Sequence, residues 1–283
     1  MISARILADS VNVCGNRLTT CLCKYPRFIH SEVLTHRDKS RNSASSRAIP
    51  VKKMLGLVIS EPAFPEFWGE NQAGMQARNE LPPHKIWLAK ALWRLSSYSQ
   101  VGFAWLMSKV GVHKQITNRL VECFSHMTVV ISGTEWGNFF NLRAHTDAQP
   151  EFQILARRML EQYVESKPKL LQPGDWHLPF SDEYLPANFP LADKLVVTTA
   201  RCARTSYLTF DGDFSLDKDR SLHNRLMESG HWSPFEHAAR AESKPIHSGN
   251  FIGFLQYRKL FSNENRSVFD PAKLLAQWEN RDG

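Results

Sequence analysis

The sequence contains no long apolar run. Its 283 residues include no stretch of about 18 consecutive apolar residues and no low-complexity tract. A helix that spans a bilayer needs roughly 20 predominantly apolar residues, so the sequence predicts no transmembrane helix and no membrane partner. The first residues, MISARILADSVNVCGN, also lack the long apolar core and the small-residue cleavage site of a secretory signal. We therefore expect a soluble protein of the cytoplasm.

Cysteine is scarce and has no paired pattern. The cysteines are Cys14, Cys21, Cys23, Cys123 and Cys202. The spacing of Cys21 and Cys23 is one residue shorter than the usual C-x2-C of zinc sites, and no second pair complements it. Scattered thiols of this kind are typical of reduced cysteines that pack as small hydrophobic side chains. The sequence predicts no metal site.

Acidic residues are the minority among the charged ones. The chain has 35 lysines and arginines against 28 aspartates and glutamates, which gives a net charge of +7. A positive protein attracts anionic partners. Nucleotides, folates, nucleic acid and anionic membranes all meet this condition, so the net charge does not choose among them.

The hydrophobic pattern favours a helix-rich α+β fold. Residues 3–30 have the pattern of a strand, a turn at Cys14-Gly15-Asn16 and a second strand. Apolar spacing and helix-stop signals predict helices over residues 84–111, 113–126, 134–145, 148–167, 194–208 and 216–230. The first of these helices shows the spacing with Trp87, Leu88, Leu92 and Leu95. We expect the aromatic side chains of these helices to lie in the core.

The stretch THRDKSRNSASSR, residues 35–47, is dense in cations and hydroxyl groups, and only Ala44 is apolar. We expect such a run to be neither a core strand nor a core-facing helix. If it is extended, Ser43, Ser45 and Arg47 share one side. Arginine forks and serine hydroxyls suit a phosphate group. The stretch is therefore either a solvated basic loop or a socket for an anion.

A second polar stretch is embedded among aromatic residues. Residues 133–151, GTEWGNFFNLRAHTDAQPE, carry Asn138, Asn141 and Arg143 on a predicted helix beside Trp136 and two phenylalanines. Such polar groups are costly to bury unless they have hydrogen-bond partners. The alternative is a helix with one polar stripe at the surface.

These stretches, together with GHWSPFEH at residues 230–237, resemble the flavin-dependent thymidylate synthases. The family signature reads Arg-His-Arg, two residues, Ser, one residue, Asn-Glu, one residue, Ser, one residue, Arg. The same register is occupied here by Thr35, His36, Arg37, Ser40, Asn42, Ser43, Ser45 and Arg47. Thr35 replaces the first arginine and Ser43 replaces the glutamate. Residues 138–153, NFFNLRAHTDAQPEFQ, are similar to the family's Asn-Phe-Leu-Asn-Leu-Arg segment, and GHWSPFEH is similar to its Gly-His-x-x-Pro-Phe-Glu-His.

The order of these motifs differs from the common family arrangement. There the Pro-Phe-Glu-His element precedes the arginine-rich signature, whereas here it follows it. A circular permutation can preserve a site when the joined ends lie close in space. We favour permutation, and a partial repeat in the C-terminal part is the alternative. We expect one domain over residues 1–283, made of a signature part (1–166), an ordered connection (167–193) and a part with the Pro-Phe-Glu-His element (194–283).

The resemblance implies a helix-rich α+β fold with an antiparallel sheet and an FAD-dependent methyltransferase. Family members convert dUMP to dTMP with methylenetetrahydrofolate as carbon donor, FAD as redox carrier and NADPH as reductant. They work as homotetramers whose active sites are shared between subunits. Because the flavin carries the hydride chemistry, the protein supplies binding, orientation and electrostatics.

The resemblance also implies roles for individual residues. Arg143 matches the catalytic arginine that stabilises the electron-rich uracil ring beside N3 and O4. The residues that match substrate contacts are Arg143, Glu32, Ser43, Ala44, Ser45, Ser46, Arg47 and Arg119. The residues that match flavin contacts are Thr35, His36, Arg37, Asn42, Asn138 and His237, with residues 132–134 as weaker candidates. We expect Glu32 to face the sugar or a neighbouring arginine, because a carboxylate repels a phosphate.

No cysteine lies in the matching stretches, whereas the flavin-free thymidylate synthases attack the substrate with a cysteine thiolate. Ser45 has the position of a nucleophile, but the local sequence offers no convincing base beside it. We therefore interpret Ser45 as a substrate contact and predict no covalent enzyme intermediate.

Two alternatives stay open. The first is a catalytically inactive homologue that still binds flavin or nucleotide, because Thr35 and Ser43 depart from the signature. The second is a nucleic-acid-binding protein, since basic and aromatic residues suit phosphate contacts and base stacking. The basic residues are not continuous and no recognised nucleic-acid module is present, so we expect no nucleic-acid partner.

Overall fold

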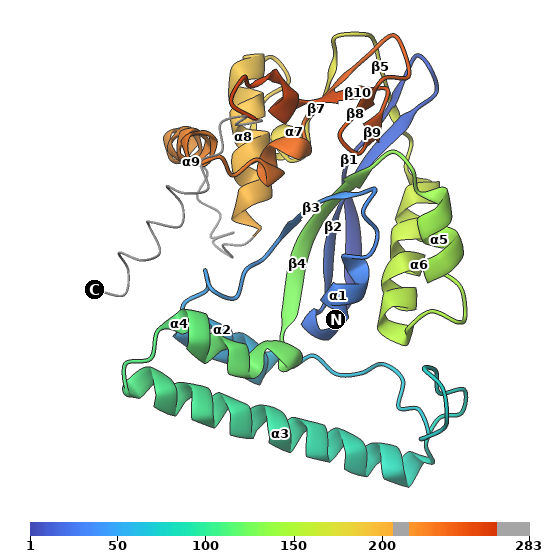
Figure 1. The fold of residues 1–283 in the computed structure, drawn as a ribbon, viewed down its shortest axis with the longest axis vertical. Coiled ribbons are helices and arrows are strands. Elements are labelled where there is room, and N and C mark those ends of the chain that lie inside the picture. The colour runs from blue at the N-terminus through green and yellow to red at the C-terminus, as the bar shows by residue number, and fades with distance from the viewer. Residues whose placement is uncertain (206–214, 265–283) are drawn as a thin grey trace, which may run out of the picture.

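A five-stranded sheet forms the centre of the protein, seen here in a computed structural model that describes residues 1–205 and 215–264 (Figure 1). The strand order is β3-β4-β2-β1-β5. The strands are β1 Ser3–Asn12, β2 Arg17–Pro26, β3 Ser40–Ser43, β4 His126–Gly133 and β5 Lys169–Leu171. Neighbouring strands are antiparallel, except that β5 runs parallel to β1. The α+β class with an antiparallel sheet is therefore confirmed.

The hairpin predicted near the N-terminus is confirmed as β1 and β2. Gly15 in its turn has a φ of +83°, a conformation that glycine adopts without a steric penalty. Asn12 Oδ1 accepts hydrogen bonds from the backbone N–H groups of Cys14 and Asn16, at 3.1 and 2.9 Å. The turn signal in the sequence thus corresponds to a real set of turn contacts.

The central strand β4 was not predicted, and the helix predicted over residues 113–126 is wrong in its length. Only a short helix, α4 Lys114–Thr117, and a 3-10 segment, η2 Asn118–Phe124, precede β4. Val129, Val130 and Ile131 are all buried. A strand that is buried on both faces is apolar throughout, so it lacks the alternation by which a strand is distinguished from a buried helix.

Strand β3 corrects the expectation that residues 35–47 contain no core strand. It forms an edge of the main sheet, and Ser40 and Asn42 are buried. Ser40 Oγ accepts hydrogen bonds from Gln256 Nε2 at 3.1 Å and from Asn250 Nδ2 at 3.3 Å. Because partners satisfy these polar groups, the sheet accommodates them in its interior.

Helices cover both faces of the sheet (Figure 1). On one face lie α5 Gly137–Arg143 and α6 Pro150–Glu165. On the other lie α7 Ser181–Tyr184 and α8 Leu191–Arg204, with α9 Leu216–Glu228 packed on α8. Val129 and Ile131 belong to the core under α5 and α6, whereas Val130 packs with Phe180 and Cys202 on the opposite face. The alternating side chains of one strand thus serve two cores.

A second group of helices lies at one end of the sheet (Figure 1). It consists of α2 Val51–Ser60, α3 Pro83–Lys109, α4 and η2. The group has a core of its own, which includes Val58, Ala104, Val121 and Phe124. The predicted helix after residue 84 is confirmed as α3, whereas α2 was not predicted.

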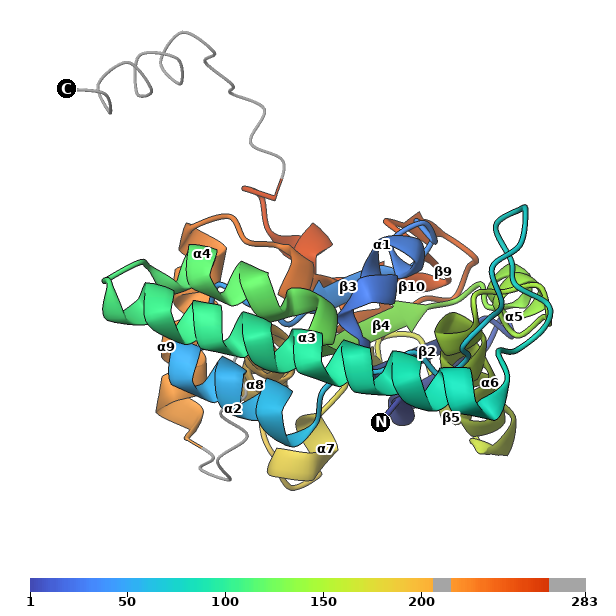
Figure 2. The same ribbon diagram turned by 90° about the horizontal axis from the view of Figure 1, so that it is seen from below.

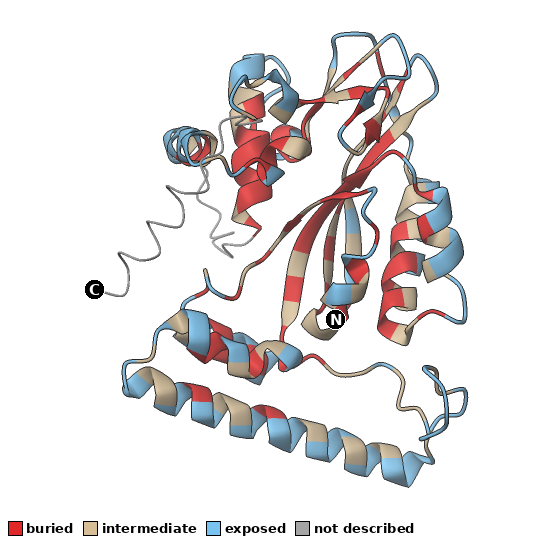
Figure 3. Cartoon of the chain, viewed as in Figure 1, coloured by how far each residue is buried: buried red, intermediate tan, exposed pale blue. Residues whose placement is uncertain are grey.

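The expectation that the aromatic residues of α3 lie in the core holds for Trp93, which packs on Phe124, and is wrong for the outward face of the helix. Trp87 is 72% exposed, and Leu88, Leu92 and Leu95 are 52%, 57% and 63% exposed. Figure 2 shows α3 as an outermost element of this end, and Figure 3 shows exposed residues along its outer side. Apolar spacing predicts a helix and its faces but does not show which face is covered. In the described part of the chain no helix, α3 included, is long and apolar enough to cross a membrane.

The remaining elements are short. Between β2 and β3 lie η1 Arg27–Ile29 and α1 His30–Val33. The C-terminal part adds β6 Trp176–His177, η3 Ser233–Glu236, β7 Ala239–Ala241, β8 His247–Ser248, β9 Phe251–Ile252, β10 Phe254–Gln256 and η4 Tyr257–Leu260. The connection predicted over residues 167–193 contains β5, β6 and α7. The helix predicted over residues 194–208 is α8, and its last three residues lie outside the described part.

Candidate functional site

The predicted socket follows the edge strand β3 into the loop before α2, residues 44–49, which we call the socket loop. Burial alternates from residue 42 to residue 47, with the even positions buried and the odd ones half-buried or exposed. Ser43, Ser45 and Arg47 are therefore the more exposed residues of the stretch. Residues 46–48 form a turn, so the segment is not extended throughout as the prediction assumed.

Before β3, two residues of the signature hold Arg143. Its Nε donates a hydrogen bond to His36 Nε2 at 2.8 Å, and its Nη2 donates to Thr35 Oγ1 at 3.2 Å. The guanidinium carbon lies 4.9 Å from the centre of the Phe152 ring. Because arginine is always protonated, His36 Nε2 must be the acceptor, so the ring proton of His36 lies on Nδ1. Two stretches that are far apart in the sequence meet at this cation.

His36 and Glu32 respond to the same cation. Burial lowers the pKa of His36 from 6.5, and the charge of Arg143 lowers it further, so His36 is neutral near pH 7. Burial raises the pKa of Glu32, and Arg143 opposes this rise. Glu32 thus lies within electrostatic reach of Arg143, which is one of the two surroundings expected for it.

Arg41 fixes the turn that carries Thr35 and His36, a role that the sequence did not reveal. Its Nη1 donates to the backbone carbonyls of Val33, Leu34 and His36 at 3.2, 2.9 and 3.0 Å. The basic residues of the stretch 35–47 therefore have different roles. No local sequence pattern distinguishes an arginine that binds backbone carbonyls from an arginine that is available to a ligand.

Lys39 joins the signature to the second polar stretch and was likewise missed. Its side chain is buried, and its Nζ donates to the Glu135 carbonyl and to Asp38 Oδ2. The ammonium nitrogen lies 4.9 Å from the centre of the Trp136 ring, a cation–π contact. This contact packs the signature against the segment that leads to Arg143.

After β3, the socket loop is held through its backbone. Asn118 Nδ2 donates to the carbonyls of Ser46 and Ile49 at 2.8 and 2.9 Å. Arg27 Nη1 donates to the Ala44 carbonyl at 3.3 Å. These hydrogen bonds fix the backbone of the loop at Ala44, Ser46 and Ile49.

Four polar and charged groups meet beside the socket loop. Ser46 Oγ donates to Glu122 Oε1. Arg119 Nη1 lies 3.2 Å from both oxygens of this carboxylate, and Arg27 Nε lies 3.4 Å from Oε1. Burial lowers the pKa of Arg27, and Glu122 opposes this change. The structure thus brings together Ser46 and Arg119, which were predicted, with Arg27 and Glu122, which were not.

Asn42 connects β3 to the C-terminal part. Its Nδ2 donates to the Cys202 carbonyl at 2.6 Å, and Ser233 Oγ donates to its Oδ1 at 2.9 Å. Ser233 belongs to the GHWSPFEH element and lies 191 positions from Asn42 in the sequence. Since both ends of its amide are bonded, Asn42 holds β3 against α8 and η3.

A buried chain of hydrogen bonds leads from β1 to His237. Ser10 Oγ bonds to His177 Nδ1 at 2.9 Å, and His177 Nε2 bonds to Thr20 Oγ1 at 2.8 Å. Thr20 Oγ1 bonds to Ser132 Oγ at 2.6 Å, which bonds to His237 Nδ1 at 2.8 Å. Burial lowers the pKa of both histidines to about 3, so both are neutral. His237 is fully buried, and its Nε2 has no hydrogen-bond partner among the described residues.

Three predicted residues remain available at the surface. Arg37, Arg47 and Asn138 are exposed, and within the described part of the chain no side-chain hydrogen bond or ion pair engages them. Arg143 contacts the residues before β3, whereas Arg119 and Ser46, which follows β3, both contact the carboxylate of Glu122. The four residues of β3 therefore separate two parts of the predicted site.

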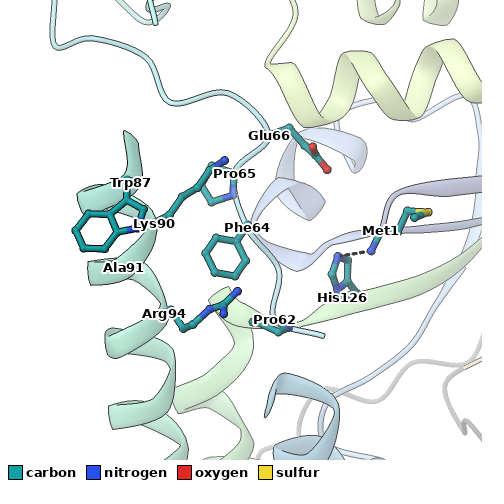
Figure 4. A pocket seen from close by; sticks show the side chains of 10 residues that line it. All are labelled: Met1, Pro62, Phe64, Pro65, Glu66, Trp87, Lys90, Ala91, Arg94 and His126. Carbon is teal, nitrogen blue, oxygen red and sulfur yellow. Dashed lines mark hydrogen bonds between the residues drawn. The ribbon is translucent and has the colours of Figure 1, made fainter. Parts of the chain in front are cut away.

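A pocket of about 560 Å³ lies away from these groups, between α3 and the loop before it (Figure 4). Phe64, Trp87 and Arg94 line it, and it contains none of the predicted site residues. Met1 and His126 also line it, so the pocket lies where α3 and its preceding loop meet the start of β4. Among residues 1–205 and 215–264, no group of three or more His, Cys, Asp or Glu side chains is arranged to hold a metal ion.

Comparison with known families agrees with this geometry. The family described as thymidylate synthase complementing protein matches residues 17–169, which is more than half of the chain. The match includes the signature on β3, Arg119 and Arg143, and it places the chain among the enzymes that form thymidylate. The chain belongs to the thymidylate synthase complementing protein family, the flavin-dependent thymidylate synthases, which are FAD-dependent methyltransferases with dUMP as substrate. No curated protein matches it.

The match confirms the resemblance to the flavin-dependent thymidylate synthases. The rearranged order of the motifs stays a prediction. It ends at residue 169, so the GHWSPFEH element and His237 lie beyond it.

The two buried histidines predict that folding stability falls in mild acid. An exposed histidine has a pKa of 6.5, whereas the pKa of His177 and of His237 is about 3 in the folded chain. As the pH falls, the unfolded chain binds these protons first, so the stabilisation is complete above pH 6.5 and is lost towards pH 3. Each histidine lowers the free energy of unfolding by up to about 1.4 kcal/mol per pH unit in this window. Urea unfolding at about pH 7.5 and about pH 5 measures the effect.

His177→Gln tests the assignment, because it removes one of these protons and should reduce the pH dependence. The exposed His247 supplies the control, since His247→Gln should leave the pH dependence unchanged. A pH dependence that His177→Gln leaves intact would contradict the assignment.

Proposed function

We propose that the chain transfers a one-carbon unit from methylenetetrahydrofolate to C5 of dUMP, and that NADPH supplies the reducing equivalents. The contact between Arg143 and His36 carries the proposal, because it joins the two family motifs in one site. FAD and dUMP follow from family membership, and the carbon donor and the reductant are taken from the same family.

Arg143 is the proposed catalytic residue. A fixed cation beside N3 and O4 of uracil stabilises the negative charge that develops when C5 becomes electron-rich. Its two partners, His36 and Thr35, are neutral, so its positive charge is not cancelled. Within the described residues, Nη1 of Arg143 makes no hydrogen bond, which leaves this donor for the substrate ring.

Thr35 has a structural place in the proposed site. Its hydroxyl accepts from Arg143 and donates to the Glu32 carbonyl at 2.6 Å. The alternative, a catalytically inactive homologue, still rests on Thr35 and Ser43, and measured flavin content together with turnover distinguishes it from an active enzyme.

The socket loop is the proposed site of the dUMP phosphate and sugar. Ser45 and Arg47 of the loop and Ser43 at the end of β3 are the more exposed residues here, and Arg119 shares the carboxylate of Glu122 with Ser46. Arginine forks and hydroxyl donors bind phosphate through charge-assisted hydrogen bonds. The backbone of the loop, from Ala44 on, is held by residues behind it, so little ordering is needed on binding. Glu32 is proposed to face the sugar from the side of Arg143.

Two of the residues assigned to flavin, Arg37 and Asn138, are exposed with polar groups available to an anionic, aromatic cofactor. His237 is fully buried, and both ends of the Asn42 amide are bonded within the chain, so their contacts with flavin stay predictions. When bound, FAD supplies the hydride chemistry. Thr35 and His36 take part by orienting Arg143 between the two ligands.

A covalent enzyme intermediate is not part of the proposal. Burial raises the pKa of Cys21 to about 12, and it also raises the pKa values of Cys23 and Cys202, so these thiols stay protonated. Within the described residues Ser45 has no hydrogen bond to a base that would activate it. Ser45 therefore remains a substrate contact.

The enzyme is proposed to be a homotetramer with shared active sites. Support comes from the outward face of α3, where Leu88, Leu92 and Leu95 are exposed in the single chain. Contiguous exposed apolar side chains typically mark a protein–protein interface. A second copy is the proposed occupant because the family assembles in this way.

A single domain with rearranged motif order, residues 1–283, is proposed for the whole chain. The bonds of Asn42 to Cys202 and Ser233 support it, because they join the signature to the C-terminal part. All five cysteines are unpaired, which supports a reducing compartment such as the cytoplasm. The absence of a nucleic-acid partner stays a prediction.

Arg143→Ala should abolish dTMP formation while most of the flavin stays bound, because the guanidinium acts on the uracil ring. Product analysis with dUMP, methylenetetrahydrofolate and NADPH, together with flavin absorbance per chain, measures both effects. Arg78→Ala is the control, since Arg78 is exposed in the loop before α3 and should be dispensable. Normal turnover of Arg143→Ala would remove Arg143 from the catalytic role.

Arg47→Ala should weaken dUMP binding by roughly tenfold to a hundredfold, the loss of a charge-assisted contact of about 1.5–3 kcal/mol. Calorimetric titration of dUMP into the flavin-loaded enzyme measures the affinity. The exposed Arg78 provides the control for a loss of net charge, through Arg78→Ala. Unchanged dUMP affinity in Arg47→Ala would exclude Arg47 from the site.

Leu92→Glu should break up the proposed homotetramer, because it introduces a charge into a buried subunit interface. Leu170→Glu is a matched control, since Leu92 on α3 and Leu170 on β5 are both 57% exposed in the single chain. Sedimentation velocity of the purified enzymes measures the assembly. The proposal fails if the unaltered chain is a monomer, or if Leu92→Glu assembles as the unaltered chain does.

A further inference from the structure

The carboxylate of Glu122 binds the donor groups that the proposed phosphate site would use for an anion. It accepts a hydrogen bond from Ser46 Oγ, and Arg119 Nη1 lies 3.2 Å from each of its oxygens. Arg27 Nε lies 3.4 Å from Oε1. Ser46 is only 1% exposed, and its single hydroxyl proton is committed to this carboxylate. An acid from the chain itself therefore fills the anion-binding position.

Only the side chain of Glu122 takes part in these contacts. Its backbone carbonyl is used separately, because it accepts from Ser125 Oγ at 2.8 Å and from the Ser125 N–H at 3.1 Å. The side chain is 21% exposed. Rotation about its own bonds can therefore move the carboxylate into solvent while the backbone of η2 keeps its position.

The charges at this point are matched to a larger anion. Arg27 and Arg119 provide two positive charges, and Glu122 cancels one of them. A nucleoside monophosphate carries a charge of about −1.5 to −2 near pH 7, which both guanidinium groups are needed to balance. A phosphate next to Ser46 and Arg119 would be repelled by Glu122 as long as the carboxylate stays in place.

We propose that Glu122 is a specificity-determining residue that takes the place of the substrate phosphate in the free enzyme and leaves when dUMP binds. The inference rests on the proposed function, which assigns Ser46 and Arg119 to dUMP. In the free enzyme the carboxylate holds these donors in position. An anion must displace the carboxylate before it can bind, and this displacement costs free energy. Small anions do not recover this cost, whereas a phosphate attached to a recognised nucleoside recovers it through the contacts of the nucleoside.

A purely structural role for Glu122 predicts the opposite result. If the carboxylate only holds Arg119 and Arg27 in a productive geometry, then its removal loosens both arginines and weakens phosphate binding. The sign of the change in affinity thus separates the two roles.

The test is equilibrium titration of the full chain with dUMP, with inorganic phosphate and with deoxyuridine. Glu122→Gln keeps the size of the side chain and removes its charge, so it should bind dUMP and inorganic phosphate about tenfold more tightly. The affinity for deoxyuridine, which has no phosphate, should not change. In steady-state assays the KM for dUMP should fall without a rise in kcat. Glu161→Gln, an exposed acid on α6, should behave like the unaltered chain.

Equal or weaker binding of dUMP and phosphate by folded Glu122→Gln would overturn the inference. If that variant does not fold, Glu122→Asp replaces it. The shorter side chain of aspartate withdraws the carboxylate from Ser46, so this variant should also bind dUMP and inorganic phosphate more tightly, by a smaller factor. Tighter phosphate binding by Glu122→Gln, with no dUMP binding by any variant, would support the role of Glu122 as an internal anion and contradict the proposed function. Unchanged phosphate binding by Glu122→Gln, with normal dUMP turnover, would support the proposed function and contradict this role of Glu122.

Discussion

The site depends on hydrogen bonds to the polar side chains of the edge strand β3. A signature so rich in serine, asparagine and cations enters a sheet only if its buried groups find partners. Gln256 and Asn250 supply them for Ser40, and residues of α8 and η3 supply them for Asn42. These partners come from the C-terminal part of the chain, so the need to satisfy β3 draws the GHWSPFEH element to the signature. The same strand then separates the proposed ring-binding end of the site from the proposed phosphate-binding end.

The arginines at the two ends of β3 have partners of different charge. At one end, neutral acceptors on His36 and Thr35 orient Arg143 and leave its charge available. At the other end, the carboxylate of Glu122 cancels part of the charge of Arg119 and Arg27. This difference follows the expected chemistry of the substrate. The uracil ring develops charge only during the reaction and needs a cation that is ready, whereas the phosphate is fully charged from the start and can displace an internal anion.

The sequence predicted the parts in which local signals agree, and it failed where partners are distant. The β1–β2 hairpin was found because the alternation and the turn at Gly15 point to the same structure, and α3 was found from its spacing. Strand β4 was missed because burial on both faces removes its alternation. The family resemblance pointed to Arg143 and His36, which the structure brings into contact, and to Arg119, whose role stays a prediction. The roles of Arg27 and Glu122 depend on contacts across many residues, and no local pattern indicates which ionisable side chain faces another. The outward face of α3 was mistaken for core because a single chain does not show what covers it.

If the proposed function is right, this chain labilises C5 of dUMP with the help of flavin. Tritium release from dUMP labelled at C5 tests this, with the purified chain, methylenetetrahydrofolate and NADPH, in the presence and absence of FAD. We expect tritium to enter water when FAD is bound and to stay on dUMP when FAD is removed. Release that is independent of flavin, or no release from a chain that has bound flavin and dUMP, would contradict the proposed function.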